Sequence, residues 1–122
     1  MQTQPCIVVA ERDSARRQSI SVALCRQGYE VREAEDGRQL LGYIEYLAAT
    51  RGKRGKPFRI AADSFAVVAG PDLGEVTAEE VREILRRARW DVPVILLPMA
   101  NGGDVAVLQA YLREILPLEP PC

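Results

Sequence analysis

The sequence contains no histidine, and only three of its 122 residues are cysteine. Zinc sites usually draw on paired cysteine and histidine ligands, and histidine is the most common general base in enzymes. Cys6, Cys25 and Cys122 are odd in number and show no Cys-x-x-Cys spacing, so neither a disulfide framework nor a zinc site is indicated. We expect Cys6 and Cys25 to be buried free thiols, and we expect no catalytic residue.

Long apolar runs and an excess of one charge are also missing. No run approaches the roughly 18–20 residues that span a bilayer, and the N-terminus lacks the basic and apolar regions of a signal peptide. The 16 basic and 17 acidic residues give a formal net charge of −1, which does not favour broad binding to nucleic acid or to a membrane. The sequence therefore predicts one soluble, cytoplasmic domain over residues 1–122.

Short apolar runs alternate with segments of helical spacing along the chain. The apolar runs predict strands at residues 5–10, 29–33, 64–69 and 93–98. The helical spacing predicts helices over residues 14–27, from 36 or 37 onward, from near 77 onward, and over 104–115. Such alternation predicts an α/β fold, a doubly wound parallel sheet with helices on both faces.

Candidate site residues follow the predicted strands, because ligands of such sheets bind beyond the carboxyl ends of the strands. Glu11, Arg12 and Asp13 come directly after the first strand. An arginine between two acidic residues is unfavourable for a cation site. The same stretch lacks the glycines of phosphate-cradling loops, which argues against a nucleotide-dependent enzyme. The basic, glycine-rich segment 51–57 is predicted to be a solvated loop, with ligand binding there left open.

Four stretches together resemble the receiver domains of two-component response regulators. They are IVVAERDS, a following helix that ends in RQGYEV, then REAEDGRQLL, and then PVILL. The resemblance covers most of the chain and implies the flavodoxin-like receiver fold with five strands. The fifth strand is expected near residues 118–120, and the fifth helix is expected to be missing from this chain.

In the resembled family, the first strand ends in an acidic pair that binds magnesium, and the third strand ends in the aspartate that accepts a phosphoryl group. The acidic pair falls on Glu11 and Arg12, with Asp13 as the next acidic residue. The acceptor falls on Ala69, or on Gly70 if the register is shifted by one residue. Alanine cannot attack phosphorus, and magnesium requires several oxygen ligands. The resemblance therefore implies a vestigial pocket that has neither a metal nor another cofactor.

Two further positions of the family pattern are also changed. The family has a serine or threonine after the fourth strand, where this chain has Pro98, and a lysine in the fifth, where it has Glu119. A glutamate would repel the phosphate that lysine attracts. Arg12 is left with several interpretations: it pairs with Glu11 or Asp72 in place of a metal, or it contacts a bound anion. Glu11 and Asp13 are expected to be solvated, with Asp13 capping the following helix.

The resemblance implies a regulatory module rather than an enzyme. Loss of the acceptor and the LEPP-like ending are similar to the N-terminal domains of FleQ-type flagellar regulators, which are sigma-54-dependent activators. An output part with an ATPase and a DNA-binding domain is therefore expected beyond Cys122, and cyclic-di-GMP is expected to act there rather than on this domain. The alternative function is a sensor of a small ligand or anion that uses the vestigial pocket.

The last predicted helix has an apolar face. Without a fifth helix, we expect this face to be exposed and to form a homodimer or larger assembly. In the competing arrangement the helix packs fully on the sheet and leaves only Tyr111 and Arg113 outside. The residues of the expected interface are Leu108, Tyr111, Leu112, Ile115 and Leu116.

Overall fold

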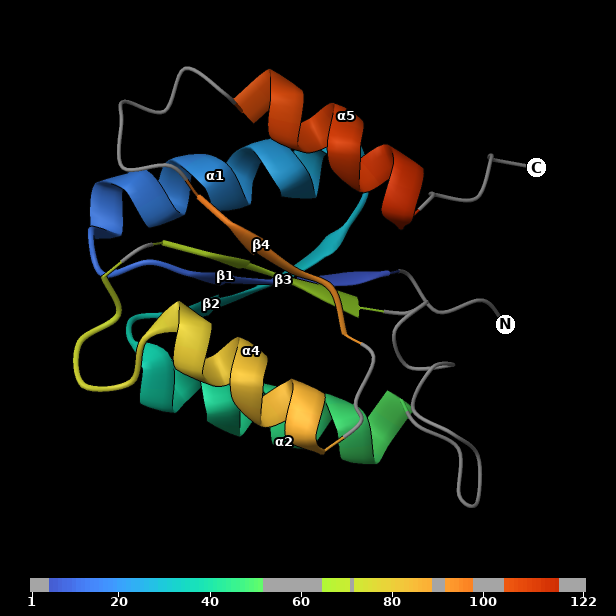
Figure 1. Cartoon of the computed structure of the whole chain (residues 1–122). Coiled ribbons are helices and arrows are strands. Elements are labelled where there is room, and N and C mark those ends of the chain that lie inside the picture. Colours follow the sequence, from blue (N-terminus) through green and yellow to red (C-terminus); the bar gives the residue numbers. More distant parts are fainter. Residues whose placement is uncertain (1–4, 52–64, 71, 89–91, 98–104, 117–122) are drawn as a thin grey trace.

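A computed structural model describes residues 5–51, 65–70, 72–88, 92–97 and 105–116. Four strands form one parallel sheet in the order β2-β1-β3-β4 (Figure 1). The strands are β1 (Cys6–Ala10), β2 (Glu30–Ala34), β3 (Phe65–Ala69) and β4 (Val94–Leu96). The helices are α1 (Ser14–Gln27), α2 (Gly37–Arg51), α4 (Ala78–Arg87) and α5 (Val105–Ile115). The predicted doubly wound fold is confirmed, and the expected fifth strand lies outside the described residues.

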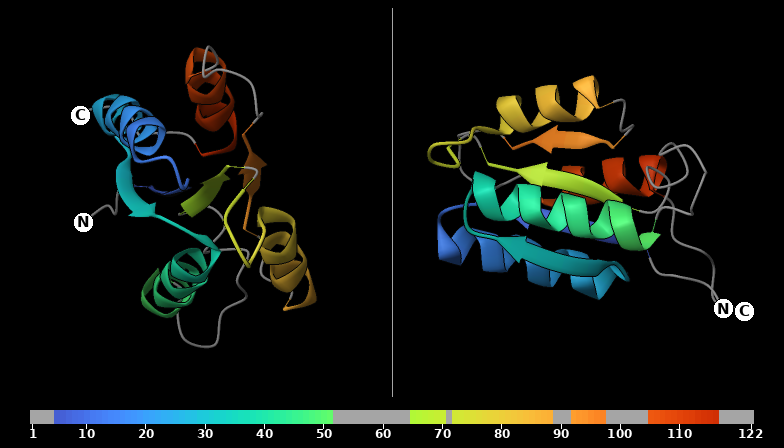
Figure 2. Two further views of the ribbon diagram at one scale, coloured as in Figure 1. Left: turned by 90° about the vertical axis from the view of Figure 1, so that its left-hand side faces the viewer. Right: turned by 90° about the horizontal axis from the view of Figure 1, so that it is seen from below.

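The sheet lies between two layers of helices, with α1 and α5 on one face and α2 and α4 on the other (Figures 1 and 2). Because successive side chains of a strand point to opposite faces, β1 contributes Ile7 and Val9 to the first layer and Cys6 and Val8 to the second. All four of these side chains are fully buried. Burial on both faces explains why β1 and β3 are continuous apolar runs.

Helix ends agree with the signals in the sequence. The carboxylate of Asp13 caps α1 by accepting hydrogen bonds from the backbone N–H groups of Ala15 and Arg16, at 3.0 and 3.3 Å. Gly28, with φ of 121°, ends the same helix in a conformation that suits glycine. Thr77 and Glu80 form a reciprocal capping box at the start of α4.

Only one of the two cysteines that were predicted to be buried is buried. Cys6 is buried as expected, but Cys25 is exposed, because it lies outside the stripe of α1 that Ile20, Ser21 and Leu24 bury. Ile84 of α4 is also exposed, at 44%. Ala78, Val81 and Leu85 are sufficient to cover the sheet at this helix.

Helix α5 packs against α1 and the sheet. Leu108, Leu112 and Leu116 are at most 7% exposed and lie in one core cluster. The side-chain amides of Gln27 and Gln109 donate to backbone carbonyls of the opposite helix, at 3.2 and 3.3 Å. The expectation of an exposed face is therefore wrong for these three leucines, because they pack against α1 and the face of the sheet that α1 covers.

Candidate functional site

The carboxyl ends of β1 and β3 lie side by side. Ala10 and Ala69 are register partners, and the N–H of Gly70 donates to the carbonyl of Ala10 at 2.8 Å. On the other side, the N–H of Glu11 donates to the carbonyl of Ala34, the last residue of β2, at 3.0 Å. Glu11 therefore follows the central strand with its backbone fixed against a neighbouring strand.

The side chain of Glu11 is buried rather than solvated, which corrects the prediction from the sequence. The residue is 6% exposed. One carboxylate oxygen, Oε2, accepts from the N–H of Asp13 at 3.1 Å. The other, Oε1, has no hydrogen-bond donor among the described residues and lies 3.6 Å from Nε of Arg16. A guanidinium therefore balances the charge of this buried carboxylate.

Because Gly70 has no side chain, the carboxylate of Glu11 occupies the space next to it. A Cβ atom placed on Gly70 would lie 2.6 Å from Oε1 of Glu11. This approach is too close for any side chain at position 70 unless Glu11 moves. The glycine after β3 is thus matched to the glutamate after β1.

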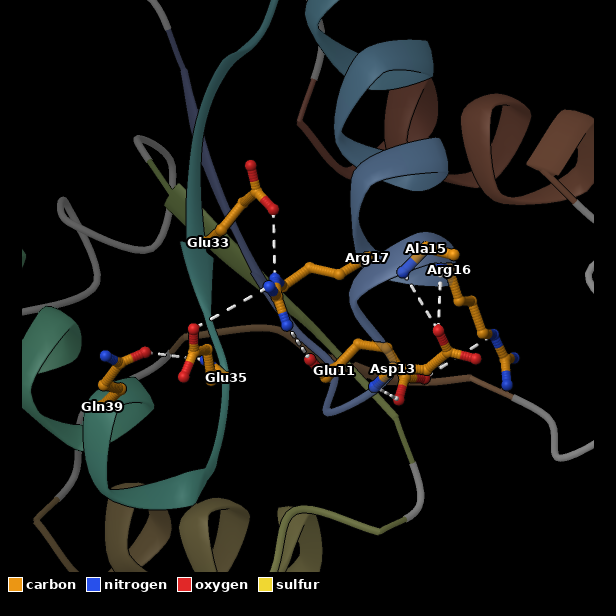
Figure 3. A network of polar contacts seen from close by, with 8 residues as sticks. All are labelled: Glu11, Asp13, Ala15, Arg16, Arg17, Glu33, Glu35 and Gln39. Atoms are coloured by element: carbon orange, nitrogen blue, oxygen red, sulfur yellow. Dashed lines mark hydrogen bonds and ion pairs between the residues drawn. The ribbon is translucent and has the colours of Figure 1, made fainter.

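Arg17 joins the ends of β1 and β2 from the first turns of α1 (Figure 3). Its Nη1 donates to the backbone carbonyl of Glu11 at 2.7 Å, and its Nε donates to Glu33 at 3.1 Å. A third carboxylate, that of Glu35, lies 4.0 Å from Nη2. The side chain of Arg17 is only 12% exposed, so it is packed into the structure around Glu11.

Arg12 has its ion-pair partner outside this buried cluster. It lies 3.7 Å from Asp72, and the two side chains are 57% and 81% exposed. Asp72 also accepts from the N–H of Gly74 at 3.2 Å. A cavity of about 330 Å³ lies beside them, lined by Arg12, Arg38 and Glu75 among others. Arg12 therefore pairs with Asp72 across the loops, and Arg16 is the arginine that neutralises Glu11.

The residues present do not fit a magnesium ion. Glu11 already contacts Arg16 and the N–H of Asp13, and Ala69 offers no oxygen from its buried side chain. Within the described part of the chain, no group of three or more Asp, Glu, His or Cys side chains could hold a metal ion. Magnesium requires several oxygen ligands in near-octahedral geometry, and the described residues at this site do not provide them.

The remaining sequence-predicted residues either lie outside the described part of the chain or belong to α5. Pro98 and Glu119 lie outside the described residues. On α5, Ile115 is partly buried against the core, and only Tyr111 of the expected interface set is exposed, at 48%. Sequence reasoning missed Arg16 and Arg17, and it considered Gly70 only as an alternative acceptor position, without its close approach to Glu11. The carboxylate partners of Arg17 are Glu33 on β2 and Glu35 just after it, 16 and 18 positions away, and no local pattern signals a pairing at that separation.

No helix in the described ranges combines the length and the apolar character that a membrane crossing requires. No family model matches this chain, and no curated protein matches it. Among solved structures, the chemotaxis protein CheY4 of Vibrio cholerae matches with a TM-score of 0.61 and 18% identity, covering 93% of this chain and 100% of that one.

Two other structures match in the same way. A response regulator receiver protein from Pseudomonas putida matches with a TM-score of 0.58 and 13% identity, over 92% of this chain and 82% of that chain. Full-length FixJ from B. japonicum gives 0.53 and 21%, over 91% of this chain and 47% of that chain. This chain thus spans about half the length of full-length FixJ. At these identities the matches show the fold, which is that of response regulator receiver domains.

Proposed function

We propose that this domain is a receiver-like regulatory module that works without phosphorylation, within a bacterial transcriptional regulator. The observation that carries the proposal is the end of β3, where Ala69 offers only a buried methyl group and the next residue, Gly70, approaches a glutamate already neutralised by Arg16. Aspartyl phosphorylation needs a carboxylate nucleophile and a cation to balance the developing charge. Among the described residues, the site supplies neither.

Signal transfer in such a module rests on contacts rather than on chemistry, so the proposed role is that of a non-enzymatic interaction domain. We assign it to the cytoplasm and to a FleQ-like flagellar or biofilm regulator, on the resemblance in the sequence. Its partners would be a second copy of the domain and the ATPase and DNA-binding output domains of the same polypeptide. Direct contact with nucleic acid or membrane is not part of the proposal.

The test is exposure to acetyl phosphate and to beryllofluoride, with magnesium present. We expect no phosphoryl mass shift and no beryllofluoride-dependent change in the NMR signals of residues 65–70. Ala69→Asp alone should also remain unmodified, because Glu11 stays paired with Arg16. A mass shift of the unaltered chain would overturn the proposal.

One observation favours the alternative of an anion sensor. The cavity of about 330 Å³ beside Arg12 also has Arg38 in its lining. However, Arg38 lies 2.8 Å from Glu75, and Arg12 pairs with Asp72. An anion must therefore compete with a carboxylate for each arginine. A thermal-shift screen against phosphate, nucleotides and cyclic dinucleotides tests this function, and stabilisation that is lost in Arg12→Ala would support it.

A further inference from the structure

A cavity of about 330 Å³ lies at the carboxyl edge of the sheet, where the segments that follow β1, β2 and β3 come together (Figure 1). Arg12 lines it from the loop after β1. Arg38 lines it from the first turn of α2, and Glu75 lines it from the loop after β3. Two positive side chains from separate elements therefore border one cavity, and neither of them neutralises the buried Glu11.

The start of α2 is fixed against the loop after β3. The N–H of Gly37 donates to the carbonyl of Leu73 at 3.1 Å, and a Cβ atom on Gly37 would collide with the backbone of Val76. This close packing places the next residue, Arg38, at the cavity. The backbone N–H of Arg38 has no acceptor among the described residues. A free N–H group at the start of a 15-residue helix favours an anion beside it.

Both arginines have carboxylate partners that can be displaced at little cost. Arg12 lies 3.7 Å from Asp72, and Arg38 lies 2.8 Å from Glu75. All four side chains are more than half exposed. Ion pairs with this exposure contribute little to stability, because water solvates each carboxylate almost as well as its partner does. An anion that contacts both guanidinium groups therefore displaces two weakly held carboxylates.

A third carboxylate at the cavity, that of Asp36, has a structural role. Its Oδ1 accepts a hydrogen bond from the N–H of Gln39 at 2.9 Å, in the first turn of α2. This carboxylate holds the helix start in place and has no arginine to release. The charges that a ligand must rearrange are thus those of the two exposed pairs.

The geometry points to this cavity as a binding site for a phosphate group, either inorganic phosphate or the phosphate of a small ester, held by Arg12, Arg38 and the N-terminus of α2. The inference deepens the anion-sensing alternative and rests on it. A guanidinium group donates two parallel hydrogen bonds to phosphate, and a dianion balances two arginines where each carboxylate balances one. The volume is at the lower end of the range of about 300–1,000 Å³ for small-molecule pockets, which suits a small ester better than a cyclic dinucleotide.

The test is an NMR titration of the whole chain with inorganic phosphate and, separately, with adenosine monophosphate. Constant ionic strength keeps the screening of surface charges the same throughout. We expect the backbone amide signals of Arg38 and Gly74 to shift. Arg12→Ala and Arg38→Ala should each weaken binding by about tenfold, because each removes charge-assisted hydrogen bonds to the phosphate. If either variant is unfolded by circular dichroism, the corresponding glutamine variant replaces it with the same expected outcome.

Removal of the competing carboxylates should have the opposite effect. Asp72→Asn and Glu75→Gln should each strengthen phosphate binding several-fold, and asparagine keeps the oxygen that accepts from the N–H of Gly74. The matched controls are Arg86→Ala and Glu83→Gln, which change the net charge in the same way at an exposed ion pair on α4. These two variants should leave the affinity for phosphate unchanged.

Tighter binding of adenosine monophosphate than of inorganic phosphate assigns an ester as the ligand, and equal or weaker binding assigns free phosphate; both support the site. Absence of a shift at Arg38 and Gly74 at about 10 mM phosphate overturns the inference, and so do equal losses for Arg38→Ala and Arg86→Ala. Binding that is lost in Arg12→Ala but unchanged in Arg38→Ala would overturn the two-arginine site and leave the sensing alternative standing. The acetyl phosphate test reports on a different part of the chain and is independent of this result.

Discussion

The carboxylate of Glu11 and the guanidinium of Arg16 lie 3.6 Å apart at the carboxyl end of β1, with side chains 8% and 23% exposed. Glu11 also sits before the first turn of α1, which contains no acidic residue of its own. The N-terminus of a helix favours negative charge, and here Glu11 and Asp13 supply it from outside the helix. The negative charge of Glu11 is thus balanced by Arg16 and by the N-terminus of α1.

Arg16→Met should destabilise the domain, because it leaves a buried carboxylate without its cation. We expect the free energy of unfolding to fall by about 1–3 kcal/mol, less than for a fully buried pair because Arg16 is partly solvated. Urea titration measures it. Adding Glu11→Gln should recover part of the loss, and Arg38→Met is the control, because the Arg38–Glu75 pair is exposed on both sides. Equal losses for the two arginines would contradict the prediction.

Arg12→Ala should have a much smaller effect than Arg16→Met. The pair with Asp72 is 3.7 Å long and both side chains are more than half exposed, so we expect a loss below about 0.5 kcal/mol that disappears at high salt. A loss above 1 kcal/mol at low salt would show that Arg12, rather than Arg16, stabilises the strand-end loops.

The fold could be predicted from the sequence because its signals are local. The apolar run at residues 7–10, the cap at Asp13 and the capping box at Thr77 each depend on residues a few positions apart. Strand and helix bounds agree with the prediction to within one or two residues for most elements. The alternation of elements then fixes a parallel sheet with helices on both faces.

The site could be predicted only in part, because its geometry depends on distant residues. Which of the neighbouring arginines faces Glu11 depends on how α1 is rotated over the sheet, and that rotation is set by the burial of Ile20 and Leu24. The match between Gly70 and Glu11 joins residues 59 positions apart. The burial of Leu112 depends on α5 packing beside α1, and an amphipathic pattern does not say which surface covers it.

Gly70→Ala should destabilise the domain, because the new methyl group would meet the buried carboxylate of Glu11 at 2.6 Å. Adding a methyl group to a closely packed site typically lowers the free energy of unfolding by about 1–3 kcal/mol. Combining it with Glu11→Ala should give a total loss smaller than the sum of the two single losses, since the clash is removed.

Gly42→Ala is the matched control for that substitution. Gly42 lies inside α2, and a Cβ there would have nothing within 4 Å. Alanine favours the helix and restricts the unfolded chain, so this variant should be stabilised by about 0.5–1 kcal/mol. Urea titration of both variants, side by side, separates the effect of the close approach from the general effect of replacing glycine. Destabilisation by both would contradict the assignment.

Tyr29→Phe tests how the end of α5 is held. The hydroxyl of Tyr29 donates to the carbonyl of Leu116 at 2.8 Å in a buried position, so at neutral pH its loss should cost about 1 kcal/mol. Burial raises the pKa of this hydroxyl, and the positive charge of Arg113 opposes the rise. The neutral form is therefore favoured in the folded state.

This raised pKa gives the hydrogen bond a specific pH dependence. A group with a higher pKa when folded contributes its full stabilisation below the pKa of the unfolded chain, near 10 for tyrosine, and loses it as the pH rises toward the folded pKa. The stability advantage of the wild-type chain over Tyr29→Phe should therefore be constant near pH 8 and shrink above about pH 10. Urea titrations of both chains across this range measure the difference. A constant advantage at alkaline pH would show that Tyr29 ionises equally easily in the folded and unfolded chains, which would contradict the prediction.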